Sequence, residues 1–289
     1  MPGKHKYRLI ILSTLIIAVL VIAVLIYHDA ELRYTLKDRI SKIGSSAELT
    51  ETAVKVKSAS LSSLLADSRT TFDDSLMLIN TDKLIKDDCE FVIVEYNDSG
   101  VYMNSCITEA YAAISREVKE RFDEKLYISS AYRTAEEQAR QIVEEGDKAQ
   151  SVGASEHQAG LAVDVYVMYY GGAAFLKHDA GQWVNSNCQD YGFIIRYPYY
   201  GEKETGIGYE PWHLRYVGFP HSEIIAKSSL TLEGYLDSLK KDVFYSYESD
   251  GESWLIVRRS GETFNVPEDY ESVVISPDNC GGYVLTFKV

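Results

Sequence analysis

The feature that most constrains this chain is an uncharged apolar run from Leu9 to Tyr27. A helix rises about 1.5 Å per residue, so a run of this length can cross the hydrocarbon core of a bilayer. A cleaved signal peptide is the main alternative. Its apolar stretch is usually about 7–15 residues long and ends in small residues, whereas this run ends at Tyr27, followed by His28 and Asp29. We therefore expect an uncleaved transmembrane anchor over residues 9–27.

The charges that flank this run predict its orientation. Lys4, Lys6 and Arg8 precede it, whereas Asp29 and Glu31 follow it. Under the positive-inside rule, the short tail 1–8 is cytoplasmic and the remainder of the chain lies outside the membrane. We expect a single-pass protein of the cell membrane with an extracytoplasmic domain.

Composition and charge exclude some classes of protein. With 46% hydrophobic and 25% charged residues, the chain has an ordinary globular composition. Its formal net charge is −14, and an acidic body is repelled by the phosphates of nucleic acid. We therefore exclude nucleic acid as a partner.

Beyond the anchor, the character of the sequence changes twice. Residues 28–72 are rich in Ser, Thr, Ala, Lys and Glu, so we interpret them as a partly helical stalk or linker with little core of its own. Over residues 73–241, strand-like apolar runs alternate with helical patterns, which predicts one α+β domain. Short strand-like segments separated by turns follow over 242–289 and predict a small β-rich C-terminal module.

Several elements of the middle domain are expected from local patterns. Apolar residues recur every three or four positions over 107–122, which predicts a helix. Thr134 and Glu137 form a capping-box pattern at the start of a second helix, over 134–145. Further helices are expected at 179–191 and 230–240, and strands at 90–96, 126–129, 161–168 and 214–217.

Four cysteines are present, Cys89, Cys106, Cys188 and Cys280. Their spacing matches no CxxC metal signature, but an oxidising space outside the membrane permits disulfides, with three full connectivities. Cys89 and Cys106 flank a strand-like segment and a turn at 97–100, so a hairpin-like return could bring them together. Their disulfide is a candidate, and Cys188 is expected to be a buried apolar residue.

The stretch 155–164 (SEHQAGLAVD) carries the first chemical signal. In a strand, alternate side chains point to opposite faces, so the apolar residues at 161, 163, 165 and 167 meet a core while Asp164 faces the other side. A buried carboxylate needs a partner, either a cation or a nearby arginine. His157 lies in the loop before the strand, next to Gly160, and can fold back over its start. His157 and Asp164 together suit zinc, through nitrogen and oxygen ligands.

The stretch 210–213 (EPWH) completes the pattern. His213 would be a third ligand, and three protein ligands with one open position are typical of catalytic zinc, whereas structural sites are closed with four. Glu210, three residues earlier, could take a proton from water and pass it to a leaving amine. Each residue alone has another explanation. A hydrogen-bonding histidine, a surface glutamate or arginine and a packed tryptophan are each commoner than the functional role, and a salt-bridged aspartate is equally common.

These motifs together resemble those of the VanY-type D-alanyl-D-alanine carboxypeptidases, in the wider lysostaphin, D-Ala-D-Ala peptidase and hedgehog-like metallopeptidase fold. The resemblance rests on the spacing Ser-x-His-x-x-Gly-x-Ala-x-Asp over 155–164 and Glu-x-Trp-His over 210–213, and covers about residues 77–240. It also takes in the stretches 130–133 (SAYR) and 191–198 (YGFIIRYP), and Gln138. It implies an α+β fold in which a small antiparallel sheet carries the metal site and helices pack against it.

The resemblance also implies roles for individual residues. His157, Asp164 and His213 would hold one zinc ion per chain, Glu210 would be the general base, and Arg133 would stabilise negative charge that develops on the scissile carbonyl. The positions expected to line the substrate site are Ser130, Gln138, Ser155 and Trp212.

The implied activity is removal of the terminal D-Ala from peptidoglycan stem peptides, with a contribution to glycopeptide resistance. An L,D-carboxypeptidase or an endopeptidase of the same fold is an open alternative, because these would share the metal site and differ in pocket shape. A catalytically inactive wall-binding module is the alternative from another class. The complete set of metal, base and arginine positions argues against that module.

Overall fold

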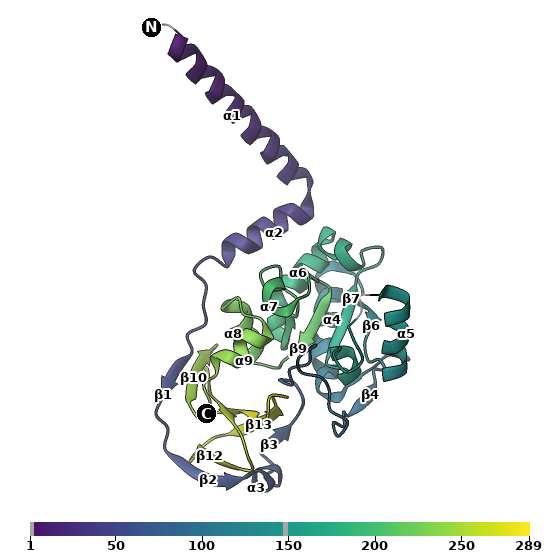
Figure 1. The fold of residues 1–289 in the computed structure, drawn as a ribbon, viewed down its shortest axis with the longest axis vertical. Coiled ribbons are helices and arrows are strands. Elements are labelled where there is room, and N and C mark those ends of the chain that lie inside the picture. Colours follow the sequence, from purple (N-terminus) through teal and green to yellow (C-terminus); the bar gives the residue numbers. More distant parts are fainter. Residues whose placement is uncertain (1–2, 147–149) are drawn as a thin grey trace.

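The computed structural model describes residues 3–146 and 150–289 as a mixed α+β fold. Figure 1 shows its arrangement. Its α-helices are α1 (Gly3–His28), α2 (Ala30–Ser41), α3 (Leu61–Leu65), α4 (Thr108–Phe122), α5 (Ala135–Glu145), α6 (Asp179–Asn187), α7 (Glu202–Thr205), α8 (His221–Lys227) and α9 (Leu232–Ser238). Its strands are β1 (Thr50–Thr52), β2 (Val56–Ser60), β3 (Thr70–Phe72), β4 (Ile93–Glu95), β5 (Tyr102–Asn104), β6 (Tyr127–Ser130), β7 (Ala162–Tyr166), β8 (Phe193–Ile195), β9 (His213–Tyr216), β10 (Phe244–Ser249), β11 (Glu252–Arg259), β12 (Thr263–Pro267), β13 (Ser272–Pro277) and β14 (Tyr283–Lys288).

Helix α1 contains the apolar run and projects away from the rest of the chain (Figure 1). Its large apolar side chains, such as Leu15 and Val19, are exposed along its length. Among the described residues, it is the one helix whose length and composition would let it cross a membrane. An exposed helix that is apolar all round is suited to a membrane span, and a signal sequence has the same character.

The middle of the chain is organised around a four-stranded antiparallel sheet of order β6-β7-β9-β8. The expected alternation in β7 is confirmed, because Leu161, Val163 and Val165 are buried in the core while Asp164 faces the other side and stays partly exposed. In the ladder between β7 and β9, Asp164 lies directly opposite His213. The strand pattern therefore brings together two residues that are 49 positions apart in sequence.

Helices α4 and α6 cover the apolar face of this sheet. Ile107, Ile114 and Val118 of the η1–α4 segment and Val184 of α6 are buried in the same core as the β7 side chains. The helix expected over 107–122 is observed from Thr108 to Phe122, after the short 3₁₀ helix η1 (Ser105–Ile107). The predicted capping box at the start of α5 is confirmed, since Thr134 and Glu137 each bond the other's backbone N–H.

Other expected elements are shorter in the structure. The helix expected over 179–191 ends at Asn187 and continues as the 3₁₀ helix η5 (Cys188–Tyr191), which stops at Gly192. Of the strand expected over 90–96, only Ile93–Glu95 pairs, with β5. The short helices α7 and α8 were not expected, because four and seven residues carry too little periodicity to be recognised.

The C-terminal strands form a second sheet, of order β1-β10-β11-β14-β13-β3. Two of its strands, β1 and β3, come from residues 50–72, and β2 from the same stretch pairs with β12. Residues 50–72 therefore differ from the expected stalk. They pair with the C-terminal module and bury Leu64 in its core, because the module offers them backbone partners and an apolar face.

Helices α8 and α9 join the two sheets. Ile224 and Leu232 pack in one core with Trp254 and Ile256 of β11. Beneath them, the buried His221 ring contacts the Tyr235 hydroxyl at 2.6 Å and the Thr286 hydroxyl at 2.8 Å. The C-terminal module is thus packed on the middle domain through a continuous apolar and hydrogen-bonded contact.

The candidate disulfide between Cys89 and Cys106 is not present, and all four cysteines are free thiols. The reason is the register of the β4–β5 hairpin, in which Ile93 lies opposite Asn104. Extending that register would place Cys106 opposite residue 91, two positions away from Cys89. Cys188 is buried, as expected.

Gly160 sits at the turn that leads into β7. Its φ is +65°, and a Cβ atom built there would lie 2.6 Å from the backbone nitrogen of Asn104. This position therefore excludes a side chain for two reasons, the left-handed backbone and the close approach of the β5 backbone.

Replacing Gly160 by alanine should lower the free energy of unfolding by more than the roughly 1–2 kcal/mol that left-handed backbone alone costs. Urea unfolding of the full chain in detergent would measure the loss. Gly251→Ala isolates the backbone cost, because Gly251 has a φ of +80° with open space around it, and Gly208→Ala should be neutral, since its backbone is ordinary and its surroundings are open. Equal losses for Gly160→Ala and Gly251→Ala would contradict the close-approach argument.

Candidate active site

Three residues predicted as metal ligands converge at one end of the β6-β7-β9-β8 sheet. His157 lies in the 3₁₀ helix η3 (Glu156–Ala159), Asp164 on β7, and His213 at the first position of β9. One ligand atom from each lies within 4.8 Å of the other two. His157 Nε2 is 3.3 Å from Asp164 Oδ2, and His213 Nδ1 is 2.9 Å from Asp164 Oδ1.

This donor set fits a zinc ion. Two imidazole nitrogens and a carboxylate oxygen are common ligands of catalytic zinc. Asp164 Oδ1 is buried and makes no hydrogen bond of normal geometry, although His213 Nδ1 is close to it. A cation between the three side chains would satisfy this otherwise costly buried oxygen.

The outer nitrogens of both histidines face protein acceptors. His157 Nδ1 donates to the carbonyl oxygen of Ala131 at 2.8 Å, and His213 Nε2 lies 3.5 Å from Glu156 Oε2. With a proton on each outer nitrogen, His157 Nε2 and His213 Nδ1 would offer their lone pairs to a cation bound beside Asp164. Such contacts usually fix the tautomer and orientation of metal-binding histidines.

The electrostatics of this cluster favour positive charge. Burial opposes the charged form of His213, but the carboxylates of Asp164 and Glu156 outweigh it and raise the pKa of His213 to about 9. Burial would raise the pKa of Asp164, yet the two histidines hold it well below its usual range. The pKa of His157 is lowered, mainly by burial. Asp164 therefore stays ionised and attracts a proton or a metal ion to the same place.

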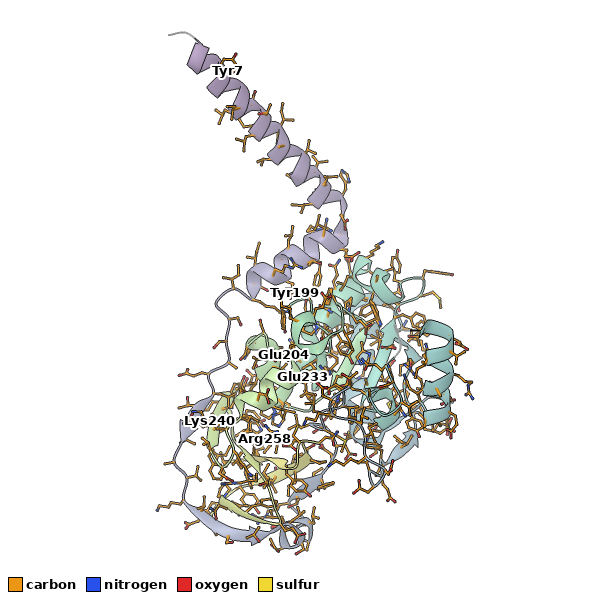
Figure 2. The ribbon with its side chains drawn as sticks, in the orientation of Figure 1. Tyr7, Tyr199, Glu204, Glu233, Lys240 and Arg258 are labelled. Atoms are coloured by element: carbon orange, nitrogen blue, oxygen red, sulfur yellow. The ribbon has the colours of Figure 1, made fainter. Side chains whose placement is uncertain are left out.

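Glu156, which the sequence analysis gave no role, is fully buried beneath the site. Its Oε1 accepts hydrogen bonds from Arg196 Nε at 2.6 Å and Arg215 Nη1 at 2.7 Å. Arg196 also pairs with Glu233 of α9, labelled near the middle of the molecule in Figure 2. Burial alone would raise the pKa of the Glu156 carboxyl, but the two arginines hold it well below its usual range. This buried cluster of Glu156, Arg196 and Arg215 keeps a negatively charged carboxylate beside His213 Nε2.

All of the predicted catalytic, metal and substrate positions line one pocket, of about 430 Å³. Its wall includes Ser130, Arg133, Gln138, Ser155, His157, Asp164, Glu210, Trp212 and His213. The structure thus brings together residues from five separate segments of the chain.

Arg133 is held in place by the residues around it. Its Nη1 donates to Gln138 Oε1 at 2.9 Å, and its Nη2 donates to Ser130 Oγ at 3.0 Å. Gln138 Nε2 in turn donates to the carbonyl oxygen of Gln150 at 2.7 Å. A guanidinium fixed in this way needs little rearrangement to stabilise charge in the pocket.

Glu210 and Trp212 lie on the loop that enters β9. Glu210 Oε2 is 3.9 Å from His213 Nδ1, and its side chain is 31% exposed, so it borders both the ligand cluster and the open pocket. Trp212 packs against the main core while it also lines the pocket, so its position serves packing as well as the pocket wall.

Sequence reasoning missed further residues of the site, four of which matter most. Tyr197 and Gln150 line the pocket, and Glu156 and Arg215 support it from below. A signal was available for two of them, since Glu156 lies between Ser155 and His157 in the motif, and Arg215 interrupts the apolar pattern of β9. A charged residue within a buried strand or motif indicates a buried partner.

Two ring nitrogens and a carboxylate around one point, with a second carboxylate and an arginine on the same pocket, form the arrangement of side chains that a zinc peptidase uses. The family model described as VanY, D-alanyl-D-alanine carboxypeptidase, matches residues 100–219, which include every proposed catalytic and ligand position. The bifunctional D-Ala-D-Ala dipeptidase and D-Ala-D-Ala carboxypeptidase VanXYC of Enterococcus gallinarum is 34% identical over 187 residues, which cover 59% of this chain and 97% of that protein. This chain belongs to the VanY family of D-alanyl-D-alanine carboxypeptidases and is a hydrolase of the peptidase class.

Two further comparisons extend the finding. A D-alanyl-D-alanine carboxypeptidase of Enterococcus faecium is 35% identical over 198 residues, covering 65% of this chain and 62% of the relative, so the match spans less than two thirds of that protein. A solved structure of a mutant of the vancomycin resistance D,D-pentapeptidase VanY, from a VanB-type resistance cassette and in complex with Zn(II), is 27% identical. It has a TM-score of 0.50 and covers 56% of this chain and 98% of that chain. The family model places its match at residues 100–219, in the middle of this chain.

Replacing Glu156 by glutamine should destabilise the fold by about 3–5 kcal/mol, because it leaves Arg215 buried without a carboxylate partner. Urea unfolding of the full chain in detergent would measure this. Asp123→Asn removes an exposed partner of Lys119 and should change stability little, since exposed ion pairs are screened by water. A Glu156→Gln variant as stable as Asp123→Asn would refute the structural role given to the buried cluster.

Proposed function

We propose that this chain is a zinc-dependent D,D-carboxypeptidase that removes the terminal D-Ala from peptidoglycan stem peptides. The observation that carries the proposal is the convergence of His157, Asp164 and His213 within 4.8 Å, on the same pocket as Glu210 and Arg133. The family and the named activities of its relatives supply the substrate class.

In this proposal His157 Nε2, Asp164 and His213 Nδ1 hold one zinc ion. When bound, zinc supplies a Lewis acid that polarises a carbonyl group and makes water more acidic. The neighbouring residues fix this geometry, because the Ala131 carbonyl and the Glu156 carboxylate occupy the outer nitrogens of the two histidines. The remaining chemistry is assigned to side chains of the pocket.

Glu210 is the proposed general base. Its Oε2 borders the ligand cluster, so it can accept a proton from the attacking water and then deliver it to the amine of the leaving D-Ala. Positioned proton transfer of this kind typically contributes about 10²–10⁴-fold in rate. Pro211, next in the chain, restricts the backbone between base and ligand.

Arg133 is the proposed electrostatic stabiliser. As the scissile carbonyl is attacked, its oxygen gains negative charge, and a fixed guanidinium nearby lowers the energy of that state. Ser130, Gln138 and Ser155 line the same pocket and offer hydroxyl and amide groups for the polar backbone of a short peptide. Trp212 would form an apolar part of the wall.

The cellular setting follows from α1 and from the named relatives. We assign α1 as an uncleaved anchor with a cytoplasmic N-terminus, which places the pocket on the side of the membrane where peptidoglycan is assembled. Removal of the terminal D-Ala would shorten stems that end in D-Ala-D-Ala. This is the basis for proposing a contribution to vancomycin resistance.

The Glu210→Gln variant should retain about one zinc ion per chain and lose at least about a hundredfold in turnover, because the amide keeps the shape but has no basicity. Elemental analysis of full-length protein in detergent gives the zinc content. Mass spectrometry of a pentapeptide stem ending in D-Ala-D-Ala gives the rate of D-Ala release. Near wild-type turnover at normal zinc content would refute the assignment of the base.

Two comparison variants separate the other roles. His213→Ala should lose both zinc and activity, whereas Arg133→Ala should keep zinc and lose mainly turnover. Chelation should abolish wild-type activity and added zinc should restore it. A wild-type protein that takes up no zinc would overturn the metal assignment.

The mature protein should retain α1. Intact-mass analysis or N-terminal sequencing of membrane-extracted protein would test this, and a mature chain beginning after residue 27 would identify α1 as a cleaved signal. That result would leave the catalytic assignment unchanged.

A further inference from the structure

Helix α2, which follows α1 after Asp29, lies against the middle domain instead of standing apart from it. Tyr34, on the inner face of α2, is buried, and its hydroxyl lies 2.8 Å from both Asn185 Oδ1 and Ser186 Oγ of α6. Gln182 of the same helix donates from Nε2 to the carbonyl oxygen of Ala30. The segment next to the membrane is therefore part of the catalytic domain's packing.

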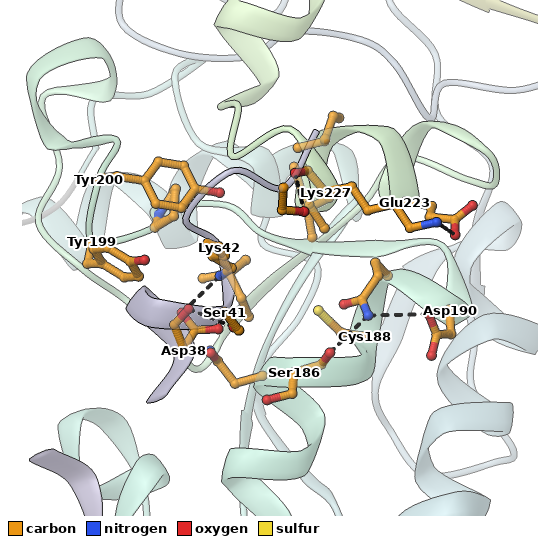
Figure 3. A pocket seen from close by; sticks show the side chains of 18 of the residues that line it. Asp38, Ser41, Lys42, Ser186, Cys188, Asp190, Tyr199, Tyr200, Glu223 and Lys227 are labelled. Atoms are coloured by element: carbon orange, nitrogen blue, oxygen red, sulfur yellow. Dashed lines mark hydrogen bonds and ion pairs between the residues drawn. The ribbon is translucent and has the colours of Figure 1, made fainter. Parts of the chain in front are cut away.

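The contact between α2 and the middle domain, here called the α2 seam, is also held at its outer face by cations stacked on aromatic rings. The guanidinium of Arg39 lies 4.6 Å from the centre of the Tyr199 ring. Lys42 pairs with Asp38 at 2.9 Å and lies near the rings of Tyr199 and Tyr200. Figure 2 shows Tyr199 close to α2. Figure 3 shows Asp38, Lys42, Tyr199 and Tyr200 at a cavity, whose volume is about 260 Å³. Each such cation–ring contact contributes modestly, and together they hold α2 in one orientation.

Asn185 connects this seam to the loop that carries Glu210. It is only 7% exposed, its Nδ2 donates to the carbonyl oxygen of Pro211 at 3.3 Å, and its Oδ1 accepts from the Tyr209 hydroxyl at 3.3 Å. The Tyr34 hydroxyl reaches the same Oδ1. One buried amide thus joins α2 to the residues on either side of Glu210.

The backbone extends this connection to the ligand cluster. The Glu210 N–H donates to the carbonyl oxygen of Tyr197 at 3.0 Å, and the His213 N–H donates to that of Glu210 at 3.2 Å. A shift of the loop at Pro211 would therefore move the Glu210 carboxylate relative to His213. Displacement of a catalytic group by about 1 Å can cost on the order of a hundredfold in rate.

We infer that Asn185, tied to Tyr34 of α2, is a positioning residue that holds the 209–213 loop and with it the carboxylate of Glu210. The inference rests on the proposed role of Glu210 and deepens it. It assigns the membrane-proximal helix a part in catalysis. Neither Tyr34 nor Asn185 lines the substrate pocket among the described residues, so their effect is expected on turnover and not on substrate binding.

The test compares Tyr34→Phe with Tyr199→Phe in the full-length protein in detergent. Both remove a phenolic hydroxyl from the α2 seam, but the Tyr199 hydroxyl makes no hydrogen bond within the described part of the chain. Tyr34→Phe should lower kcat roughly three- to tenfold on the pentapeptide stem, the scale of one lost hydrogen bond. KM should stay within about twofold and zinc content should be unchanged. Tyr199→Phe should match the wild type.

Hydrogen exchange gives a readout that does not depend on the proposed activity. In zinc-loaded protein, Tyr34→Phe should speed exchange at residues 209–213, and Tyr199→Phe should not. If the wild type releases no D-Ala, the proposed function fails, but the exchange comparison still decides the link between α2 and the loop. Equal exchange in the two variants would overturn the inference, and so would a kcat loss matched by an equal rise in KM.

Two more variants test whether Tyr34 acts on the 209–213 loop through Asn185. Ser186→Ala should have little effect if Tyr34 acts through Asn185, and an effect equal to that of Tyr34→Phe would overturn the assignment of Asn185. Asn185→Ala should lower kcat at least as much as Tyr34→Phe. Adding Tyr34→Phe to Asn185→Ala should then cause little further loss, because two residues in series are not additive. Full additivity would contradict the connection.

Discussion

The antiparallel pairing of β7 with β9 is the interaction on which the site depends. It sets Asp164 directly opposite His213, and His157 comes from the turn just before the same strand. A slip of one residue in β7 would turn Asp164 into the apolar core and bring a valine to the site. The buried side chains of Leu161 and Val163 make that slip costly. Apolar packing on one face of the sheet therefore keeps Asp164 opposite His213 on the other face.

The buried charges beneath the sheet reconcile two opposing requirements, negative charge at the site and stability of the fold. A site that attracts a cation needs negative charge, yet a buried carboxylate without a partner destabilises a fold. Here the charge of Glu156 is balanced by Arg196 and Arg215, while the ion pairs of Asp164 within the described part of the chain are with the two histidines. The fold therefore neutralises the carboxylate of Glu156, which faces His213 Nε2, and leaves the carboxylate of Asp164 available to a cation. The same arrangement places three charged side chains in a region where apolar residues would pack more easily.

Local patterns predicted much of the fold and the residues of the pocket. The alternation around Asp164, the period of α4 and the capping box of Thr134 are decided by neighbours in sequence, and each appears as expected. What could not be predicted depends on distant partners. The pairing of residues 50–72 with the C-terminal strands, the docking of Tyr34 on Asn185 and the register that separates Cys89 from Cys106 are set by tertiary contacts that leave no periodic signal.

The sheet that unites β1 and β3 with β10, β11, β13 and β14 constrains how the protein is made (Figure 1). The segment 50–72 emerges early during synthesis, but its partner strands begin only at residue 244. Closing a loop of this size is slow compared with local folding. Until their partner strands have been synthesised, β1 and β3 have unpaired edges that can associate with other chains. This sheet therefore forms only after residues 244–288 have been made, and a chain truncated before them would be exposed to aggregation and quality-control proteolysis even though its predicted catalytic motifs were intact.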